Sequence, residues 1–322
     1  MLIYITVWLI LIAAILLYFR IADRYNIIDK PNERSSHSYL TIRGGGIIFP
    51  LAALLWFVFY GFDSKWAISG LLVISVISFL DDLRPLSGKV RMVVHIAAVS
   101  LLFYGAGMFN LHWYWLVIAY LVAVYWINAF NFMDGINGIT PFYCLSALGT
   151  FWYLNRDIYF FHKELIVVLL ISTLIFSFFN ARKRARTFAG DVGSVSLAFL
   201  LWWMMMALIL HSGRFEYILF FAVYGIDSVF TIIFRLTRGE NIFQAHRSHL
   251  YQKLSNELKW PHVQVSVIYA LVQLTINGIV VFLISSNRMN FPVLFSLVIF
   301  LSALYLWLRY QAVLQIRRLD GK

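Results

Sequence analysis

Long apolar stretches recur along the whole chain, and this feature limits the possible folds more than any other. Eleven of them approach the roughly 20 residues that a helix needs to cross the hydrocarbon core of a bilayer. They lie at 1–20, 46–62, 66–80, 90–107, 111–127, 138–154, 164–180, 192–211, 216–234, 263–284 and 291–309. Because 61% of the residues are hydrophobic and 13% are charged, against about a quarter charged in soluble domains, a soluble globule is excluded. The sequence predicts an all-α polytopic membrane protein with about eleven transmembrane helices.

The chain shows no sign of division into separate domains. No internal repeat or low-complexity linker interrupts it, and no soluble domain has room between the stretches, so we expect 1–322 to form one integral-membrane domain. The first stretch lacks a basic n-region and a small-residue cleavage site, so we expect it to be retained as a helix. The single cysteine, Cys144, excludes an intrachain disulfide and a cysteine-based metal centre.

The 26 Lys and Arg residues are distributed unevenly between the two predicted sides of the membrane. Only Lys65, Arg156, Lys163, Arg214 and Arg288 fall on one side, and all the others fall on the opposite side. The positive-inside rule assigns the richer side to the cytoplasm, with the N-terminus outside and the C-terminus inside. The net charge of +11 is therefore mainly a topology signal. A nucleic-acid partner is disfavoured because no soluble basic domain is present.

Four aspartates lie at predicted cytoplasmic helix ends. Asp81 and Asp82 close the third stretch, Asp134 follows the fifth, and Asp191 precedes the eighth within G-D-V-G-S. Each alone has a structural explanation, as a solvated pair, a turn residue or an N-cap. If the helices bring these carboxylates together, their repulsion requires a cation, and ligands that are all oxygen favour Mg²⁺, with Mn²⁺ as the alternative.

The segment at 128–138 is polar but contains no Lys or Arg, and we place it in the loop after the fifth stretch. Asn128 and Asn131 are three residues apart and can share a helix face. Two glycines further on allow a turn that releases Asn137 from the helix end. We expect these three amides to bind a charged or sugar-bearing substrate. Turn formation and helix capping are the structural alternative.

Basic residues follow the acidic motifs and suit contact with phosphate. His246 and His249 are three residues apart with Arg247 between them. A zinc site is disfavoured because no cysteine and no third nearby histidine complete it, and an ordinary interfacial histidine pair is the structural alternative. The other candidates for neutralising phosphate charge are Arg43, Lys89 and Arg91. Together these residues predict phosphoryl transfer assisted by Mg²⁺ at the cytoplasmic membrane surface.

The motifs also resemble, in their order, those of the polyprenyl-phosphate N-acetylhexosamine-1-phosphate transferases. This is glycosyltransferase family 4, whose members are relatives of phospho-MurNAc-pentapeptide translocase. The matching segments are RSSHSYLTIRGGG at 34–46, DDLRPLSGKVR at 81–91, NAFNFMDGINGI at 128–139, GDVGS at 190–194 and HRSH at 246–249. The resemblance implies a bacterial inner-membrane enzyme in which undecaprenyl phosphate attacks the β-phosphate of a UDP-N-acetyl sugar and UMP is released.

The resemblance also implies roles for individual residues. The implied catalytic residues are Asp81, Asp82, Asp134 and His249. Asp191 matches the magnesium ligand, and Asp81 and Asp82 match the pair that handles the lipid phosphate and the metal. Asn131 and Asp134 match the segment near the nucleotide and diphosphate.

The sequence leaves the sugar, the oligomeric state, the alternative function and the role of Asp227 open. The HRSH form is similar to the branch that transfers N-acetylfucosamine or N-acetylquinovosamine phosphates, so O-antigen initiation is expected, with N-acetylglucosamine as the other sugar. Tyr251 and Gln252 stand where many relatives have histidines. The oligomeric state is undetermined, and a homodimer is compatible with the sequence. A secondary transporter of an anionic substrate is the alternative function, but transporters place polar residues near the membrane midplane, commonly within repeats. Asp227, inside the ninth stretch, is a functional candidate that we leave outside the predicted site.

Overall fold

The computed structural model describes residues 2–29, 39–241, 247–319 and 321. The helices are α1 (Leu2–Arg24), α2 (Ile48–Phe59), α3 (Lys65–Leu83), α4 (Gly88–Gly105), α5 (Trp113–Met133), α6 (Ile139–Ile158), α7 (Lys163–Asn180), α8 (Gly190–Ser212), α9 (Ala222–Thr237), α10 (Leu250–Gln252), α11 (His262–Ser285) and α12 (Phe291–Leu319). The short elements are β1 (Ile28–Asp29), β2 (Thr41–Ile42), the 3₁₀ helices η1 (Gly45–Ile47), η2 (Met108–Asn110) and η3 (Phe215–Phe221), and the π-helix η4 (Lys253–Glu257).

The described residues form a helical membrane bundle, as the sequence predicts. Nine helical segments in the described ranges are long and apolar enough to cross a membrane, η3 and α9 counting together as one. The stretch Gly45–Phe59 is apolar but shorter. Every one of the eleven predicted stretches falls on a helix, whereas the number of crossings and their orientation stay predictions. The all-α polytopic fold is therefore confirmed.

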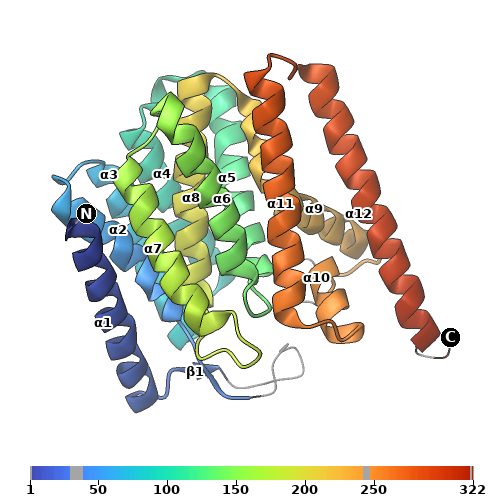
Figure 1. The fold of residues 1–322 in the computed structure, drawn as a ribbon, viewed down its shortest axis with the longest axis horizontal. Helices are drawn as coiled ribbons and strands as arrows, with labels where there is room; N and C mark the ends of the chain where they lie inside the picture. The colour runs from blue at the N-terminus through green and yellow to red at the C-terminus, as the bar shows by residue number, and fades with distance from the viewer. Residues whose placement is uncertain (1, 30–38, 242–246, 320, 322) are drawn as a thin grey trace.

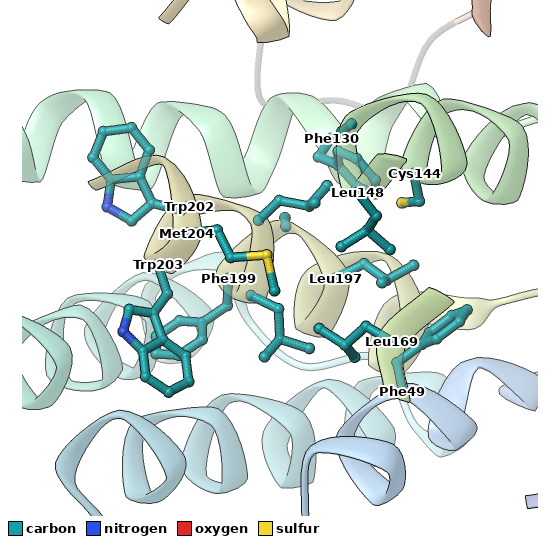
Figure 2. Close-up of a cluster of buried hydrophobic side chains, with 14 of the residues drawn as sticks. Phe49, Phe130, Cys144, Leu148, Leu169, Leu197, Phe199, Trp202, Trp203 and Met204 are labelled. Atoms are coloured by element: carbon teal, nitrogen blue, oxygen red, sulfur yellow. The ribbon is translucent and has the colours of Figure 1, made fainter. Parts of the chain in front are cut away.

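Helix α8 forms the centre of the bundle. It is apolar on all sides, so it is stable only when other helices surround it, and its side chains are buried along most of its length. Figure 2 shows Leu197, Phe199 and Met204 of α8 between Phe49 of α2 and Phe130 of α5. Figure 1 shows α11 and α12 at one side of the bundle, with α12 at its edge. The α8 position brings its first turn among the ends of α3, α5 and α7.

A short backbone ladder connects the segment after α1 to the chain between α7 and α8. β1 pairs antiparallel with β2, with Ile28 opposite Ile42. Ile42 also forms a parallel bridge with Thr187. Gly45 N–H then donates to Phe188 O (2.9 Å), and the following residue donates to Ala189 O (3.0 Å). The loop containing Arg43 is thereby held against the start of α8.

The structure corrects the predicted end of the fifth membrane stretch. We expected the loop to begin at Asn128, but α5 continues to Met133, so Asn128 and Asn131 are helical. Two large apolar residues, Phe130 and Met133, are fully buried in this last turn. Their burial extends the helix past the point at which the sequence becomes polar.

Candidate active site

The last turn of α3 meets the first turn of α8 through Asp82. Its Oδ1 accepts a hydrogen bond from Asp191 N–H (2.8 Å), and its Oδ2 accepts one from Val192 N–H (3.0 Å). The first turn of a helix cannot pair these N–H groups internally, and they carry the positive end of the helix dipole. Gly190 permits the contact, because its φ is +69° and a Cβ there would lie 2.5 Å from Asp82 Oδ2. Asp82 therefore holds α3 against the N-terminus of α8.

Asp191 does not cap its own helix, although its position before an apolar stretch is typical of an N-cap. The N-cap residue of α8 is Ala189, which makes no side-chain capping bond. The Asp191 carboxyl group instead lies beside that of Asp81, since Arg91 Nη1 is 3.8 Å from Asp191 Oδ2 and 3.2 Å from Asp81 Oδ2. We refer to Asp81, Asp82 and Asp191 as the acidic cluster.

Arg43 and Arg91 join Asp191 to the two aspartates of α3. Arg43 Nε donates to Asp82 Oδ1 (2.7 Å), and its Nη2 lies 3.8 Å from Asp191 Oδ1. Arg91 Nη1 donates to Asp81 Oδ2 (3.2 Å) and lies 3.8 Å from Asp191 Oδ2. Burial lowers the pKa of Arg43, but the Asp82 and Asp191 carboxylates outweigh it and raise the pKa above its ordinary value. The two arginine side chains are 35% and 42% exposed, so both can reach a soluble anion.

Close backbone packing places Arg43 at the acidic cluster. Gly46 of η1 touches Gly193 of α8, and a Cβ on Gly193 would lie 2.6 Å from Gly46 Cα. The Tyr18 hydroxyl of α1 donates to Arg43 O (2.6 Å). Glycine at these two positions therefore allows the arginine loop to reach the first turn of α8.

Three further basic residues were predicted from the sequence, namely Lys89, Arg247 and His246. Lys89 is exposed, and because it lies two residues from Arg91 on α4, the two side chains point to different helix faces. Arg247 is half-buried. His246 lies outside the described residues.

Asn131 and Asp134 each accept a hydrogen bond from a hydroxyl group. Ser194 of α8 donates to Asn131 Oδ1 (2.6 Å), and Thr140 of α6 donates to Asp134 Oδ1 (2.5 Å). Burial raises the pKa of Asp134 to about 6, the Thr140 hydrogen bond acts in the opposite direction, and the negative charge of Asp82 adds to the rise. Sequence analysis missed both hydroxyl residues, because serine and threonine in an apolar helix carry no distinctive signal.

Asn128 and Asn137 have partners that suit a structural role. Asn128 Nδ2 donates to Val124 O of its own helix (2.7 Å) and lines an apolar groove of about 550 Å³ between α4 and α5. The buried Asn137 donates from Nδ2 to Arg182 O (2.7 Å), which ties the turn before α6 to the loop after α7. The Asn137 contact matches the structural alternative, Asn128 bonds within its own helix, and the contact of both amides with substrate stays a prediction.

His249 is buried and lies at the N-terminus of α10. Its Nδ1 is 3.2 Å from Asp227 Oδ1, and its backbone N–H donates to Gln252 Oε1 (3.2 Å). Its ring stacks on Tyr251 with centroids 5.7 Å apart. The Tyr251 hydroxyl donates to Phe132 O (2.9 Å), in the turn that contains Asp134. We refer to residues 247–252 as the histidine segment, and Tyr251 connects it to the α5–α6 turn.

Comparison with known proteins shows which proteins this chain is similar to. Residues 66–209 match the family model described as glycosyl transferase family 4, a range that includes the whole acidic cluster. The chain is 26% identical to a probable undecaprenyl-phosphate N-acetylglucosaminyl 1-phosphate transferase of Bacillus subtilis, over 88% of this chain and 84% of that protein.

Two further relatives share one name, phospho-N-acetylmuramoyl-pentapeptide-transferase. The Thermotoga neapolitana protein is 26% identical over 71% of this chain and 80% of its own length. The Streptococcus agalactiae protein is 28% identical over 49% of this chain and 56% of its own length. The motifs, the membrane bundle and these matches agree. Over residues 66–209 the chain is therefore similar to glycosyl transferase family 4, and over most of its length it is similar to proteins named as undecaprenyl-phosphate N-acetylglucosaminyl 1-phosphate and phospho-N-acetylmuramoyl-pentapeptide transferases.

Proposed function

We propose that this protein transfers an N-acetylhexosamine 1-phosphate from a UDP-sugar to undecaprenyl phosphate and releases UMP. An oxygen of the lipid phosphate forms a bond to the β-phosphorus of the UDP-sugar. The bond from that phosphorus to the bridging oxygen breaks, and UMP leaves with this oxygen and its electron pair. The observation that carries the proposal is the acidic cluster, which two helices assemble at one end of a membrane bundle beside two partly exposed arginines.

The acidic cluster fits a hard divalent cation, and we propose Mg²⁺, with Mn²⁺ as a substitute. Arg91 Nη1 lies 3.2 Å from Asp81 Oδ2 and 3.8 Å from Asp191 Oδ2, so the two carboxyl groups are close to each other, and a cation between them would reduce their repulsion. Their all-oxygen donor set is the one that Mg²⁺ prefers. When bound, the ion would neutralise phosphate charge. The described residues contain no preformed group of three or more His, Cys, Asp or Glu with metal-site geometry, so substrate phosphate would supply further ligands.

The two predicted metal ligands differ in their surroundings. Both carboxylate oxygens of Asp82 accept hydrogen bonds, from Arg43 and from two backbone N–H groups of α8. Asp191 has a partly exposed carboxyl group, with 19% of the side chain accessible. We therefore propose Asp191 with Asp81 as the principal ligands, and we assign Asp82 to positioning the first turn of α8.

The basic and polar side chains around the acidic cluster would bind the two substrates. Arg43 and Arg91 are charged and reach the surface, so they would hold phosphate oxygens. The α5–α6 turn with Asn131 and Asp134 would contact the nucleotide and diphosphate, and His249 would support the leaving phosphate. The apolar groove between α4 and α5 includes Met92, the residue after Arg91. It would accept part of a polyprenyl chain whose phosphate lies at the acidic cluster.

We propose N-acetylglucosamine as the first sugar to test, because the Bacillus subtilis relative is named for it. N-acetylfucosamine and N-acetylquinovosamine are the alternative sugars, because the HRSH segment is similar to the branch that transfers their phosphates. Either of them would favour a role in O-antigen initiation. UDP-sugars are charged and do not cross a bilayer unaided. We therefore propose that the acidic cluster faces the cytoplasm from a bacterial inner membrane, in agreement with the positive-inside rule.

The decisive experiment is the mass of the lipid product. Purified protein is incubated with undecaprenyl phosphate and a panel of UDP-N-acetyl sugars, and the lipid and nucleotide products are analysed by mass spectrometry. The proposal expects a lipid carrying one additional sugar phosphate, together with UMP. Release of UDP would indicate transfer of the sugar without its phosphate and would contradict the proposal. Absence of product with the whole panel would also contradict it.

The cation assignment is tested with Asp191→Asn in the same assay. The variant keeps side-chain size but loses the charge, so we expect turnover to fall by about three orders of magnitude or more, as for the loss of a major electrostatic contact. EDTA should abolish wild-type turnover, and added Mg²⁺ should restore it. Turnover that resists EDTA would exclude the cation. Gel filtration in detergent checks that the variant is folded.

A further inference from the structure

Asp227 is a carboxylate in the membrane bundle that the proposed reaction does not yet use. It lies inside the apolar segment of α9 and is 1% exposed. An ionisable side chain inside a membrane segment is costly unless it is paired, and such residues are commonly functional. The acidic cluster does not include Asp227, so its burial needs an explanation of its own.

Five hydrogen-bond donors converge on the Asp227 carboxylate. They are Thr231 Oγ1 (3.2 Å), His249 Nδ1 (3.2 Å), Leu250 N (3.2 Å) and Tyr305 OH (3.0 Å) at Oδ1, and Tyr269 OH (2.7 Å) at Oδ2. These donors belong to α9, the histidine segment, α11 and α12. Asp227 is thus a junction between the histidine segment and three helices.

Arg309 of α12 provides positive charge near this junction. Its Nη1 donates to the Tyr305 hydroxyl (2.9 Å), which in turn donates to Asp227. Arg309 is also buried. An ionised Asp227 therefore has the Arg309 cation nearby, through the Tyr305 hydroxyl.

Two of the five donors belong to the histidine segment, and this determines how the imidazole of His249 is held. The contact with Asp227 turns Nδ1 toward the carboxylate and directs Nε2 away from it. The Leu250 N–H bond fixes the backbone beside the ring. Stacking on Tyr251, whose hydroxyl binds Phe132 O, sets the ring relative to the α5–α6 turn.

We propose that Asp227 is a positioning residue for phosphoryl transfer, which acts by holding the imidazole of His249 in one tautomer and one orientation. This inference rests on the proposed function, because it assigns His249 to the leaving phosphate. Asp227 itself touches neither substrate. Its carboxylate also stabilises the imidazolium whenever His249 gains a proton, as in other aspartate–histidine pairs of enzymes.

A double-mutant cycle tests this assignment. The rate of UMP release is measured for the wild type, Asp227→Asn, His249→Ala and the double variant, with undecaprenyl phosphate and UDP-N-acetylglucosamine. We expect Asp227→Asn to lower kcat about 10- to 100-fold and to change the KM of the UDP-sugar less than about threefold. In the His249→Ala background the same change should have almost no further effect, because the residue to be positioned is absent.

Two further variants separate positioning from packing. Tyr305→Phe removes another donor from the same Asp227 oxygen but leaves the histidine pair, so its kcat should stay within about twofold of the wild type. Asp227→Glu retains the charge but displaces it, and it repeats the cycle if the asparagine variant does not fold. We expect its loss of kcat also to disappear in the His249→Ala background. Gel filtration and thermal unfolding in detergent check the fold of each variant.

The outcomes distinguish this inference from the proposed function. An active wild type with additive effects of the two substitutions would overturn the positioning role and assign Asp227 to packing. A Tyr305→Phe loss as large as that of Asp227→Asn, or a His249→Ala variant with wild-type kcat, would do the same. A wild type that releases no UMP with any UDP-sugar would overturn the proposed function and this inference together.

Discussion

At the residue scale, individual aspartates of this protein differ in their hydrogen-bond donors, and these donors affect the pKa of each carboxyl group. Asp82 is surrounded by N–H donors from Arg43 and from the first turn of α8. Asp134 accepts one hydroxyl hydrogen bond, and burial raises its pKa to about 6. At Asp82 burial raises the pKa, and the charge of Arg43 and the backbone N–H groups of Asp191 and Val192 oppose that rise. With a pKa of about 6, Asp134 changes its charge just below neutral pH.

This difference predicts how the stability of Asp134→Asn depends on pH. The folded-state pKa of Asp134 is above its unfolded value, so its contribution to stability is present at low pH and is lost as the pH rises through about 6. Asparagine cannot ionise. We therefore expect the free energy of unfolding of Asp134→Asn, relative to that of the wild type, to rise by about 1–2 kcal/mol between pH 4.5 and pH 7.5.

The measurement is thermal unfolding of the wild type and of Asp134→Asn in detergent at several pH values. Thr140→Val is the control, since it removes the hydroxyl group that donates to Asp134 but keeps the Asp134 carboxyl group. A difference between Asp134→Asn and the wild type that is constant across this pH range would show that the Asp134 pKa is not raised.

At the element scale, the site depends on how closely η1 approaches α8. Two glycines meet there, and their contact sets the distance between the arginine loop and the acidic cluster. Gly193→Ala would place a Cβ 2.6 Å from Gly46 Cα and 2.9 Å from Ala189 Cβ. Since both neighbours are close to backbone, they cannot move away cheaply, and overpacking of this kind costs about 1–3 kcal/mol.

A loss of 1 kcal/mol lowers the melting temperature by at most about 2–4 °C in a chain of this size. We therefore expect Gly193→Ala to lower the melting temperature by several degrees and to reduce the rate of UMP release. Gly149→Ala on α6 is a matched control, because a Cβ there meets nothing within 4 Å and alanine favours a helix. Equal stability of the two variants would show that the η1–α8 contact can relax without cost.

At the scale of the whole molecule, the ends of α3, α5 and α7 and the start of α8 lie at one end of the bundle, together with the histidine segment. Helix α8, which is central in Figure 1, makes this possible, because α2, α3, α5 and α6 pack against it. The basic loop at 182–186 follows α7 at this same end. One face of the membrane should therefore carry both the reaction and most of the positive charge.

The orientation is tested by cysteine labelling in a Cys144→Ala background. Single cysteines in the 180–190 and 240–260 loops should react with a membrane-impermeant thiol reagent only after the cytoplasmic side is made accessible. A cysteine in the 286–290 loop, on the predicted outer side, is the matched control and should react in intact cells. Labelling of the first two loops from outside would reverse the proposed orientation.

The sequence alone determined the helical membrane fold and the identity of the reactive motifs. Helix length and apolarity are local properties, so each predicted stretch coincides with a helix, and the motifs lie in short continuous segments. The end of α5 was predicted too early, because burial of Phe130 and Met133 outweighs the local polarity around Asn128 and Asn131.

Only the tertiary structure decided which side chains meet. Asp82 caps a helix that begins more than 100 residues later, and Asn137 binds a carbonyl 45 residues away. Asp227 accepts a hydrogen bond from the hydroxyl group of Tyr305, which lies 78 residues later in the chain. The identity of a residue states what it can donate or accept, but not which partner long-range packing will bring to it. For that reason the acidic motifs were recognised from sequence, whereas the capping role of Asp82 and the pairing of Asp227 with His249 required the folded bundle.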